Sequence, residues 1–351
     1  MVTSPSRLFS EIATAERPTE TRVLMRRAVV LGGSIAGLMA ARVLSDHADE
    51  VLIIERDPSD VDGGPRPGVP QGSQVHALLP AGQIQLERWF PGIVDEALAL
   101  GAPPPPGDPG AAKIFVNGVL GLPPAPSDTG PMLITTRPFL EALVRRRTLA
   151  VGNIRMVYGR AEGLVLANRR VAGARYVPDG GGEPVVEPAD LVVDAMGRSS
   201  RLSDWLADNG WPRPPMQRMP IKLNYATALF KQDEKVSDAW VVVYHTMAGK
   251  GRSARIGGIN SVEGDRWIML VAATTRTGPP ATSPTSPPAA ASTTRACSAT
   301  SPNTGRCSAG WPRTTRRTAD AGTSTSSTAC PPDWSPPVTR SPPSTRCTAR
   351  A

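Results

Sequence analysis

The fold of this chain is decided by one stretch near its N-terminus, Ala28-Val29-Val30-Leu31-Gly32-Gly33-Ser34-Ile35-Ala36-Gly37. Its first four residues form a short apolar run that is typical of a buried strand, and the glycines follow at once. Small and aliphatic residues continue to Leu44 and predict a helix, after which residues 51–54 form a second apolar run that ends in Glu55. The order strand, tight glycine turn, helix, strand over about thirty residues predicts a βαβ unit.

The glycine turn has the spacing of a dinucleotide-binding loop, with one departure. Gly32 allows the tight turn, and the backbone N–H groups of Gly33, Ser34, Ile35 and Ala36 can approach a pyrophosphate at the positive end of the helix. Gly37 lets the helix pack closely on the strand, and the Glu55 carboxylate can accept from ribose hydroxyls. Ser34 replaces the usual middle glycine, and its small side chain preserves the backbone approach. The alternative is a glycine turn that merely connects a strand to a helix.

The pattern along the chain predicts an α/β fold with two folded parts. Apolar runs and turn residues predict a loop at 57–74, helices at 81–90 and 138–147, and strands at 154–157, 163–165, 171–176 and 191–194. Further strands are expected at 226–230, 240–244, 254–259 and 266–272. We therefore expect a flexible extension at 1–26, a Rossmann-like domain with a central parallel sheet at 27–215 that includes inserted segments, and an incomplete β-sheet domain at 216–275.

The C-terminal quarter has a different composition. Residues 276–351 contain nine Arg and two Asp, a balance of +7, so that residues 1–275 carry only +1 of the net charge of +8. This tail holds all four cysteines and lacks Leu, Ile, Phe, Tyr and Met, so we expect it to be disordered. Its scattered arginines lack aromatic platforms, which argues against a nucleic-acid partner. No apolar run is long enough to cross a bilayer and the first residues do not resemble a secretory signal, so a cytoplasmic protein without a membrane partner is expected.

Taken together, these motifs resemble the flavoprotein monooxygenases of the aromatic-hydroxylase fold, nearest the bacterial branch related to polyether and squalene epoxidases. The resemblance covers residues 27–275. Besides the glycine turn it rests on Glu55-Arg56-Asp57, Gly68-Val69-Pro70-Gln71 with His76, Thr136-Arg137-Pro138-Phe139-Leu140-Glu141, residues 191–200 and residues 263–268.

The resemblance implies FAD as the cofactor and further cofactor-binding residues. Arg56 would lie near the adenosine, Arg66 and Gln71 in a loop that approaches the flavin, and Arg137 would reach FAD from the helix it opens. Asp194 belongs to the motif at residues 191–200 and is expected at the cofactor as well. Arg137 could instead be a solvated charge at a helix start.

Four further positions limit what the resemblance implies. His76 is expected to be packed or capping rather than catalytic, and His47 and His245 have no supporting pattern. Met196 stands where many similar hydroxylases have Asp in contact with FAD and NADPH, and methionine offers no acceptor of that strength.

The implied reaction transfers one oxygen atom from O2, through a flavin C4a-hydroperoxide, to a small organic substrate. Electrons would come from NAD(P)H or from a separate flavin reductase. The signature of tryptophan halogenases is absent, and no catalytic acid–base pair or metal site is recognisable. Two alternatives remain: an FAD-binding reductase or dehydrogenase of the same fold, and a nucleotide-binding remnant without catalysis.

The abrupt change after Thr275 suggests that the tail is translated out of frame. In the shifted frame, codons permitted for residues 329–351 can encode Gly-Asp-Ala, then Asn-Pro, then Gly-Gln-Gly, which resembles the motif of the family that contacts the ribityl chain. A chain without that motif is expected to bind FAD weakly and to have little or no activity.

Overall fold

The structure is a computed structural model that describes residues 4–12, 14, 16–58, 64–106, 108–121, 132–217, 223–232, 240–247, 249 and 253–274. The predictions made for residues 276–351 lie outside these described residues.

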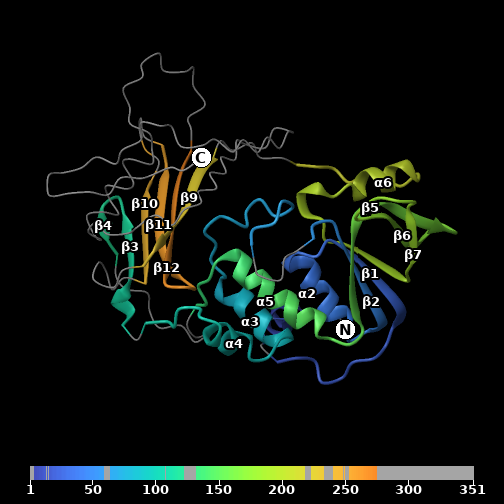
Figure 1. Cartoon of the computed structure of the whole chain (residues 1–351), viewed down its shortest axis with the longest axis horizontal. Helices are drawn as coiled ribbons and strands as arrows, with labels where there is room; N and C mark the ends of the chain where they lie inside the picture. Colours follow the sequence, from blue (N-terminus) through green and yellow to red (C-terminus); the bar gives the residue numbers. More distant parts are fainter. Residues whose placement is uncertain are drawn as a thin grey trace, which may run out of the picture.

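The predicted βαβ unit forms the middle of the parallel part of a six-stranded sheet (Figure 1). β1 (Met25–Leu31) continues through the glycine turn into α2 (Ile35–Leu44) and returns as β2 (Ala48–Glu55). β1 pairs in parallel with β2 and with β8 (Leu191–Asp194), and β2 pairs in parallel with β5 (Ile154–Ala167). β6 (Arg170–Pro178) and β7 (Val185–Pro188) complete the order β7-β6-β5-β2-β1-β8 in antiparallel pairing.

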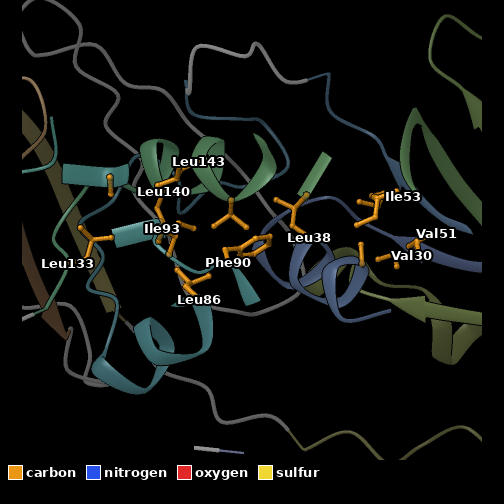
Figure 2. Close-up of a cluster of buried hydrophobic side chains, with 14 of the residues drawn as sticks. Val30, Leu38, Val51, Ile53, Leu86, Phe90, Ile93, Leu133, Leu140 and Leu143 are labelled. Carbon is orange, nitrogen blue, oxygen red and sulfur yellow. The ribbon is translucent and has the colours of Figure 1, made fainter. Parts of the chain in front are cut away.

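Alternate side chains of the central strands serve two hydrophobic cores, as expected for a parallel sheet covered on both faces. Val30 and Ile53 face the larger core, which four helices cover: α2, α3 (Pro80–Trp89), α4 (Ile93–Ala99) and α5 (Arg137–Leu149). Figure 2 shows this core, where Leu38, Phe90 and Leu140 fill the space between helices and sheet. The opposite face, with Leu31 and Ile54, packs on Trp205 from α6 (Leu202–Asp208) and on residues of β6.

The second sheet is mainly antiparallel and has the order β4-β3-β10-β11-β12-β9. The predicted strands are present as β9 (Leu223–Lys231), β10 (Val241–Thr246), β11 (Arg255–Val262) and β12 (Arg266–Thr274). This sheet also takes β3 (Ala112–Val116) and β4 (Val119–Leu120), which follow a short 3-10 turn at Pro109–Ala111. An inserted segment of the first part of the chain therefore supplies one edge of the second sheet, and the predicted α/β fold class is confirmed.

Buried contacts join the second sheet to the N-terminus of α5. Thr136, the N-cap of α5, donates from its backbone N (2.9 Å) and its hydroxyl (2.6 Å) to the Glu263 carboxylate in the β11–β12 turn. A small apolar cluster of Ile134, Val262 and Ile268 lies beside this contact. The N-terminus of α5 is thereby fixed between the two sheets.

Several elements differ from the sequence prediction. Residues 154–157 and 163–165 belong to one continuous strand, β5, because irregular pairing near Gly163 lets the strand continue past the glycine. α4, α6 and β7 were not predicted, since each is only four to seven residues long, too short for a hydrophobic period to show. The extension expected at 1–26 contains α1 (Pro5–Ile12), and Arg17 pairs with Asp46 at 2.7 Å. Within the described ranges, no helix combines the length and the apolar character needed to cross a bilayer.

Candidate dinucleotide-binding site

The glycine turn, residues 32–37, forms a tight cradle at the carboxyl end of β1. Gly32 has a φ of +102°, and a Cβ there would lie 2.7 Å from the carbonyl oxygen of Ala195 beside β8. A Cβ on Gly37 would lie only 1.7 Å from the carbonyl oxygen of Gly32, so glycine is the residue that lets α2 approach the turn. Ser34 has φ −86° and ψ −176°, ordinary extended values at which a side chain causes no backbone strain. The departure at Ser34 therefore leaves the cradle intact.

Glu55 lies directly beside the cradle at the end of β2, where the sequence places it. One carboxylate oxygen accepts from the backbone N of Gly33, and the other accepts from the backbone N of Asp57 at 2.8 Å. The residue is only 5% exposed. Because a carboxylate has about four lone-pair sites, these two bonds orient the group and leave acceptor capacity for a ligand hydroxyl.

The loop after β2 brings Arg66 to the cradle. Its Nη1 lies 3.2 Å from Oε1 of Glu55 and 3.7 Å from Oδ2 of Asp57. Burial alone would lower the pKa of Arg66, but the carboxylates of Glu141 and Glu55 raise it, so the guanidinium stays charged. Arg56 is half-exposed and pairs with Asp57 at 3.6 Å. Gln71 lies in the same loop with an exposed side chain.

A buried charge cluster, which sequence reasoning missed, lies over the cradle and is centred on Glu141 of α5. Its Oε2 accepts from the Ser34 hydroxyl at 2.8 Å, and its Oε1 accepts from Nε of Arg66 at 2.8 Å and from Nη2 of Arg145 at 3.2 Å. Nε of Arg137 lies 3.6 Å from Oε2. We call Glu141 with these four partners the Glu141 cluster. The signal for it is the spacing of Arg137, Glu141 and Arg145, which puts charged residues four apart on one helix face.

Arg137, predicted from the resemblance, is part of this cluster. It begins α5, directly after the Thr136 cap, and its Nη2 lies 3.4 Å from the Ser34 hydroxyl. Arg145 adds a second link to the turn, since its Nη2 donates to the carbonyl oxygen of Gly33 at 2.9 Å. The structure thus brings two predicted arginines, Arg66 and Arg137, into the Glu141 cluster beside Ser34.

A cavity of about 340 Å³ adjoins the cluster along the outer side of α5. Its lining includes Arg66, Arg137, Glu141 and Arg145, together with residues of the loop after β2 such as Val69. This volume is at the lower end of the range of ligand sites in proteins, and the Glu141 cluster lies between the cavity and Ser34 of the cradle.

The remaining predicted positions lie at different places. Asp194 ends β8 next to the cradle, where its carboxylate accepts from the backbone N of Met196 at 2.9 Å and from the hydroxyl of Ser200. In this structure Asp194 thus holds the turn that follows β8. Among the described residues, no three His, Cys, Asp or Glu side chains are arranged to hold a metal ion.

His76 is partly buried, and the positive charge of Arg137 is near enough to influence it. Neither ring nitrogen has a hydrogen-bond partner within the described structure. Burial, and secondarily the positive charge of Arg137, lower the pKa of His76 from 6.5 to about 4. The imidazole is therefore neutral at physiological pH, which suits the packed role that the sequence suggests.

Comparison with known proteins places this geometry in context. The chain is 32% identical over 263 residues to Protein Rv3254 of Mycobacterium tuberculosis, a match that covers 73% of this chain and 55% of that protein. No model of a known protein family matches. The chain thus spans about half the length of the curated relative it matches.

Solved structures with a similar fold include PqsL of Pseudomonas aeruginosa, described as a probable FAD-dependent monooxygenase, with a TM-score of 0.51, 18% identity, and coverage of 72% of this chain and 60% of PqsL. A PqsL variant matches with a TM-score of 0.53, and PqsL in complex with 2-aminobenzoylacetate with a TM-score of 0.52. They are 18% and 17% identical, respectively, and each match covers 72% of this chain and 61% of PqsL. The described part of this chain therefore has the fold of PqsL.

Proposed function

We propose that this chain is the FAD-binding part of an FAD-dependent monooxygenase, with an FAD-binding domain at 27–215 and part of a substrate-domain sheet at 216–275. The observation that carries the proposal is the glycine cradle with Glu55 at its side, on a fold shared with PqsL.

The residues present fit the dinucleotide part of FAD. The first turn of α2 leaves backbone N–H groups without partners inside the helix, and residues 34–36 supply them to a pyrophosphate. Glu55 would accept from the adenosine ribose, and the half-exposed Arg56 would lie near the adenosine. Arg66 and Arg137 provide positive charge for the phosphates.

For the flavin end we propose contacts from Gln71 and from Asp194. Gln71 lies in the loop after β2, and Asp194 lies at the carboxyl end of β8. Bound FAD would supply the redox chemistry, with electrons from NAD(P)H or a separate flavin reductase and one oxygen atom from O2 delivered to a small organic substrate. The protein's own residues would bind and orient the groups and exclude water.

The substrate class proposed is a small olefin or aromatic molecule, as in an epoxidase or hydroxylase. PqsL has been solved with 2-aminobenzoylacetate, an aromatic compound of that size. The second sheet, whose β11–β12 turn is joined to the start of α5 by the Thr136–Glu263 contact, is the part of the chain we expect to contact the substrate.

We further propose that residues 276–351 are translated out of frame and that the chain as written binds FAD weakly and has little or no activity. Sequencing of the coding DNA across codons 270–351 tests this part. A sequence that encodes Gly-Asp-Ala, Asn-Pro and Gly-Gln-Gly in the other frame supports it. A sequence that cannot encode them contradicts it.

Titration with FAD tests the central proposal. Saturable quenching of flavin fluorescence by the purified chain, weakened by Glu55→Gln and by Gly37→Ala, is the expected result. Absence of any flavin binding would instead favour a nucleotide-binding remnant without catalysis.

A flavin reductase or dehydrogenase of the same fold is the second candidate, because the cradle would bind FAD for either reaction. The gene restored to its full reading frame separates the two. Incorporation of ¹⁸O from ¹⁸O2 into an alkene or aromatic substrate indicates a monooxygenase, whereas electron transfer without incorporation indicates a reductase.

A further inference from the structure

The carboxylate of Glu141 occupies a position built for an anion. It is only 7% exposed, and it accepts from the Ser34 hydroxyl and from the guanidinium groups of Arg66 and Arg145. Ser34 is the N-cap of α2, but its side chain makes no capping bond and donates to Glu141 instead. The hydroxyl at the positive end of this helix therefore serves an anion that comes from a different helix.

The buried charges at the cradle balance without any ligand. Three carboxylates and three guanidinium groups, each at most 20% exposed, meet there: Glu55, Asp57, Glu141, Arg66, Arg137 and Arg145. A diphosphate brings two further negative charges. If Glu141 stayed in place, the cluster would hold five negative against three positive groups, and like charges at such distances repel strongly in a dry site.

The arginines retain capacity for a second anion. Nη1 of Arg66 lies 3.2 Å from Oε1 of Glu55, and Nε of Arg137 lies 3.6 Å from Oε2 of Glu141, but within the described structure both nitrogens are buried without a hydrogen bond. The cavity of about 340 Å³ opens beside both groups and is lined by Glu141 itself. A liquid water takes about 30 Å³, so there is room for the Glu141 side chain to turn away or for a phosphate to enter.

We propose that Glu141 is an internal substitute for the diphosphate: its carboxylate fills the phosphate site in the ligand-free protein and is displaced when a diphosphate binds to Ser34, Arg66 and Arg145. The identity of the ligand as FAD rests on the proposed function, whereas the exchange of one anion for another does not. Glu141 then sets the affinity of the site, because every binding event has to break its contacts first.

The test compares wild type with Glu141→Gln and Glu141→Ala. Glu96→Gln is the matched control, because Glu96 also pairs with arginines of α5, at 2.6 Å to Arg146, but on the solvent side. The two probes are inorganic pyrophosphate and FAD. Binding of pyrophosphate is measured by the shift in the thermal unfolding temperature, and binding of FAD by the quenching of flavin fluorescence. Glu141→Gln keeps the shape of the side chain and removes its charge, so binding can still be measured with this variant if Glu141→Ala does not fold.

We expect Glu141→Gln to bind FAD about tenfold more tightly than wild type, as when a competing state that holds about nine-tenths of the molecules is removed. Glu141→Ala should unfold at a lower temperature without ligand, and pyrophosphate should raise that temperature by more than it does in wild type. Glu96→Gln should behave as wild type in both assays.

Equal or weaker binding of both probes by Glu141→Gln would overturn the proposal and would show that Glu141 orients the arginines for the ligand. If pyrophosphate responds as expected but no variant binds FAD, the anion exchange stands and the proposed FAD function fails. If wild type binds FAD and Glu141→Gln binds it no better, the FAD function stands and the exchange is refuted.

Discussion

Replacing Gly37 by alanine would place a Cβ 1.7 Å from the carbonyl oxygen of Gly32. The position of a Cβ is fixed by its own backbone, and the atom that it meets is a backbone oxygen, so no side-chain rotation relieves the overlap. An ordinary contact begins near 3.4 Å, so α2 would have to move by about 1.7 Å relative to the turn. Leu38 and Ala41 on the same helix are fully buried, and a shift of that size disturbs their packing.

The expected cost follows from this geometry. Overpacking a core typically costs about 1–3 kcal/mol, and a clash between two backbone segments belongs at the upper end of that range. For a domain of about 200 residues, a loss of about 3 kcal/mol lowers the midpoint of thermal unfolding by roughly 6–12 °C. FAD binding should fall as well, because the displaced helix carries the N–H groups of the cradle.

Gly152→Ala is the matched control. Gly152 is exposed, and a Cβ there meets no atom within 4 Å, so the change should alter the free energy of unfolding by no more than about 0.5 kcal/mol. Gly33→Ala should be intermediate, since its Cβ would lie 3.0 Å from the Glu55 side chain and 3.1 Å from Cε of Met156, overlaps that require shifts of only a few tenths of an ångström. Thermal and urea unfolding followed by circular dichroism measure all three. A Gly37→Ala variant as stable as Gly152→Ala would refute the close approach of α2.

Three further predictions follow from single contacts. Glu263→Ala leaves the two Thr136 donors without their acceptor and should cost about 2–4 kcal/mol in urea unfolding; an unchanged midpoint would contradict the role of this contact. The pKa of His76 is lowered to about 4, so the unfolded chain takes up the proton first and the free energy of unfolding should fall by up to about 3 kcal/mol between pH 6.5 and 4. His76→Gln should remove that slope and His47→Gln should keep it. Glu55→Gln should weaken FAD binding about tenfold or more in a fluorescence titration, because the ribose loses a charged acceptor.

The βαβ unit of the first sheet was predictable from sequence because its signals are local. The apolar run before Gly32, the positions of Gly37 and Glu55, and the second run at 51–54 together determine a βαβ unit within about thirty residues. Side chains on both faces of β1 and β2 are buried, which is why these strands read as continuous apolar runs.

The edge of the second sheet was not predictable in the same way. β3 pairs in parallel with β10, with Lys113 opposite Val242, across about 130 residues of sequence. The exposed apolar residues of this edge, such as Val116 of β3 and Val119 of β4, extend over too short a span to show where the partner strand lies. Pairing of this kind depends on the closure of long loops, and hydrophobic periodicity contains no information about it.

The Glu141 cluster shows why a charge pattern alone does not reveal a site. Arg145 and Arg146 are neighbours on α5, and both pair with a glutamate. Successive residues of a helix differ by about 100° in direction, so Arg145 faces the cradle with its side chain 10% exposed, while Arg146 faces solvent with 53% exposed. In sequence the two are equivalent, and an exposed pair contributes little to stability. Only the packing of α5 on α2 separates them, and it turns Arg145 with Glu141 into part of an anion site.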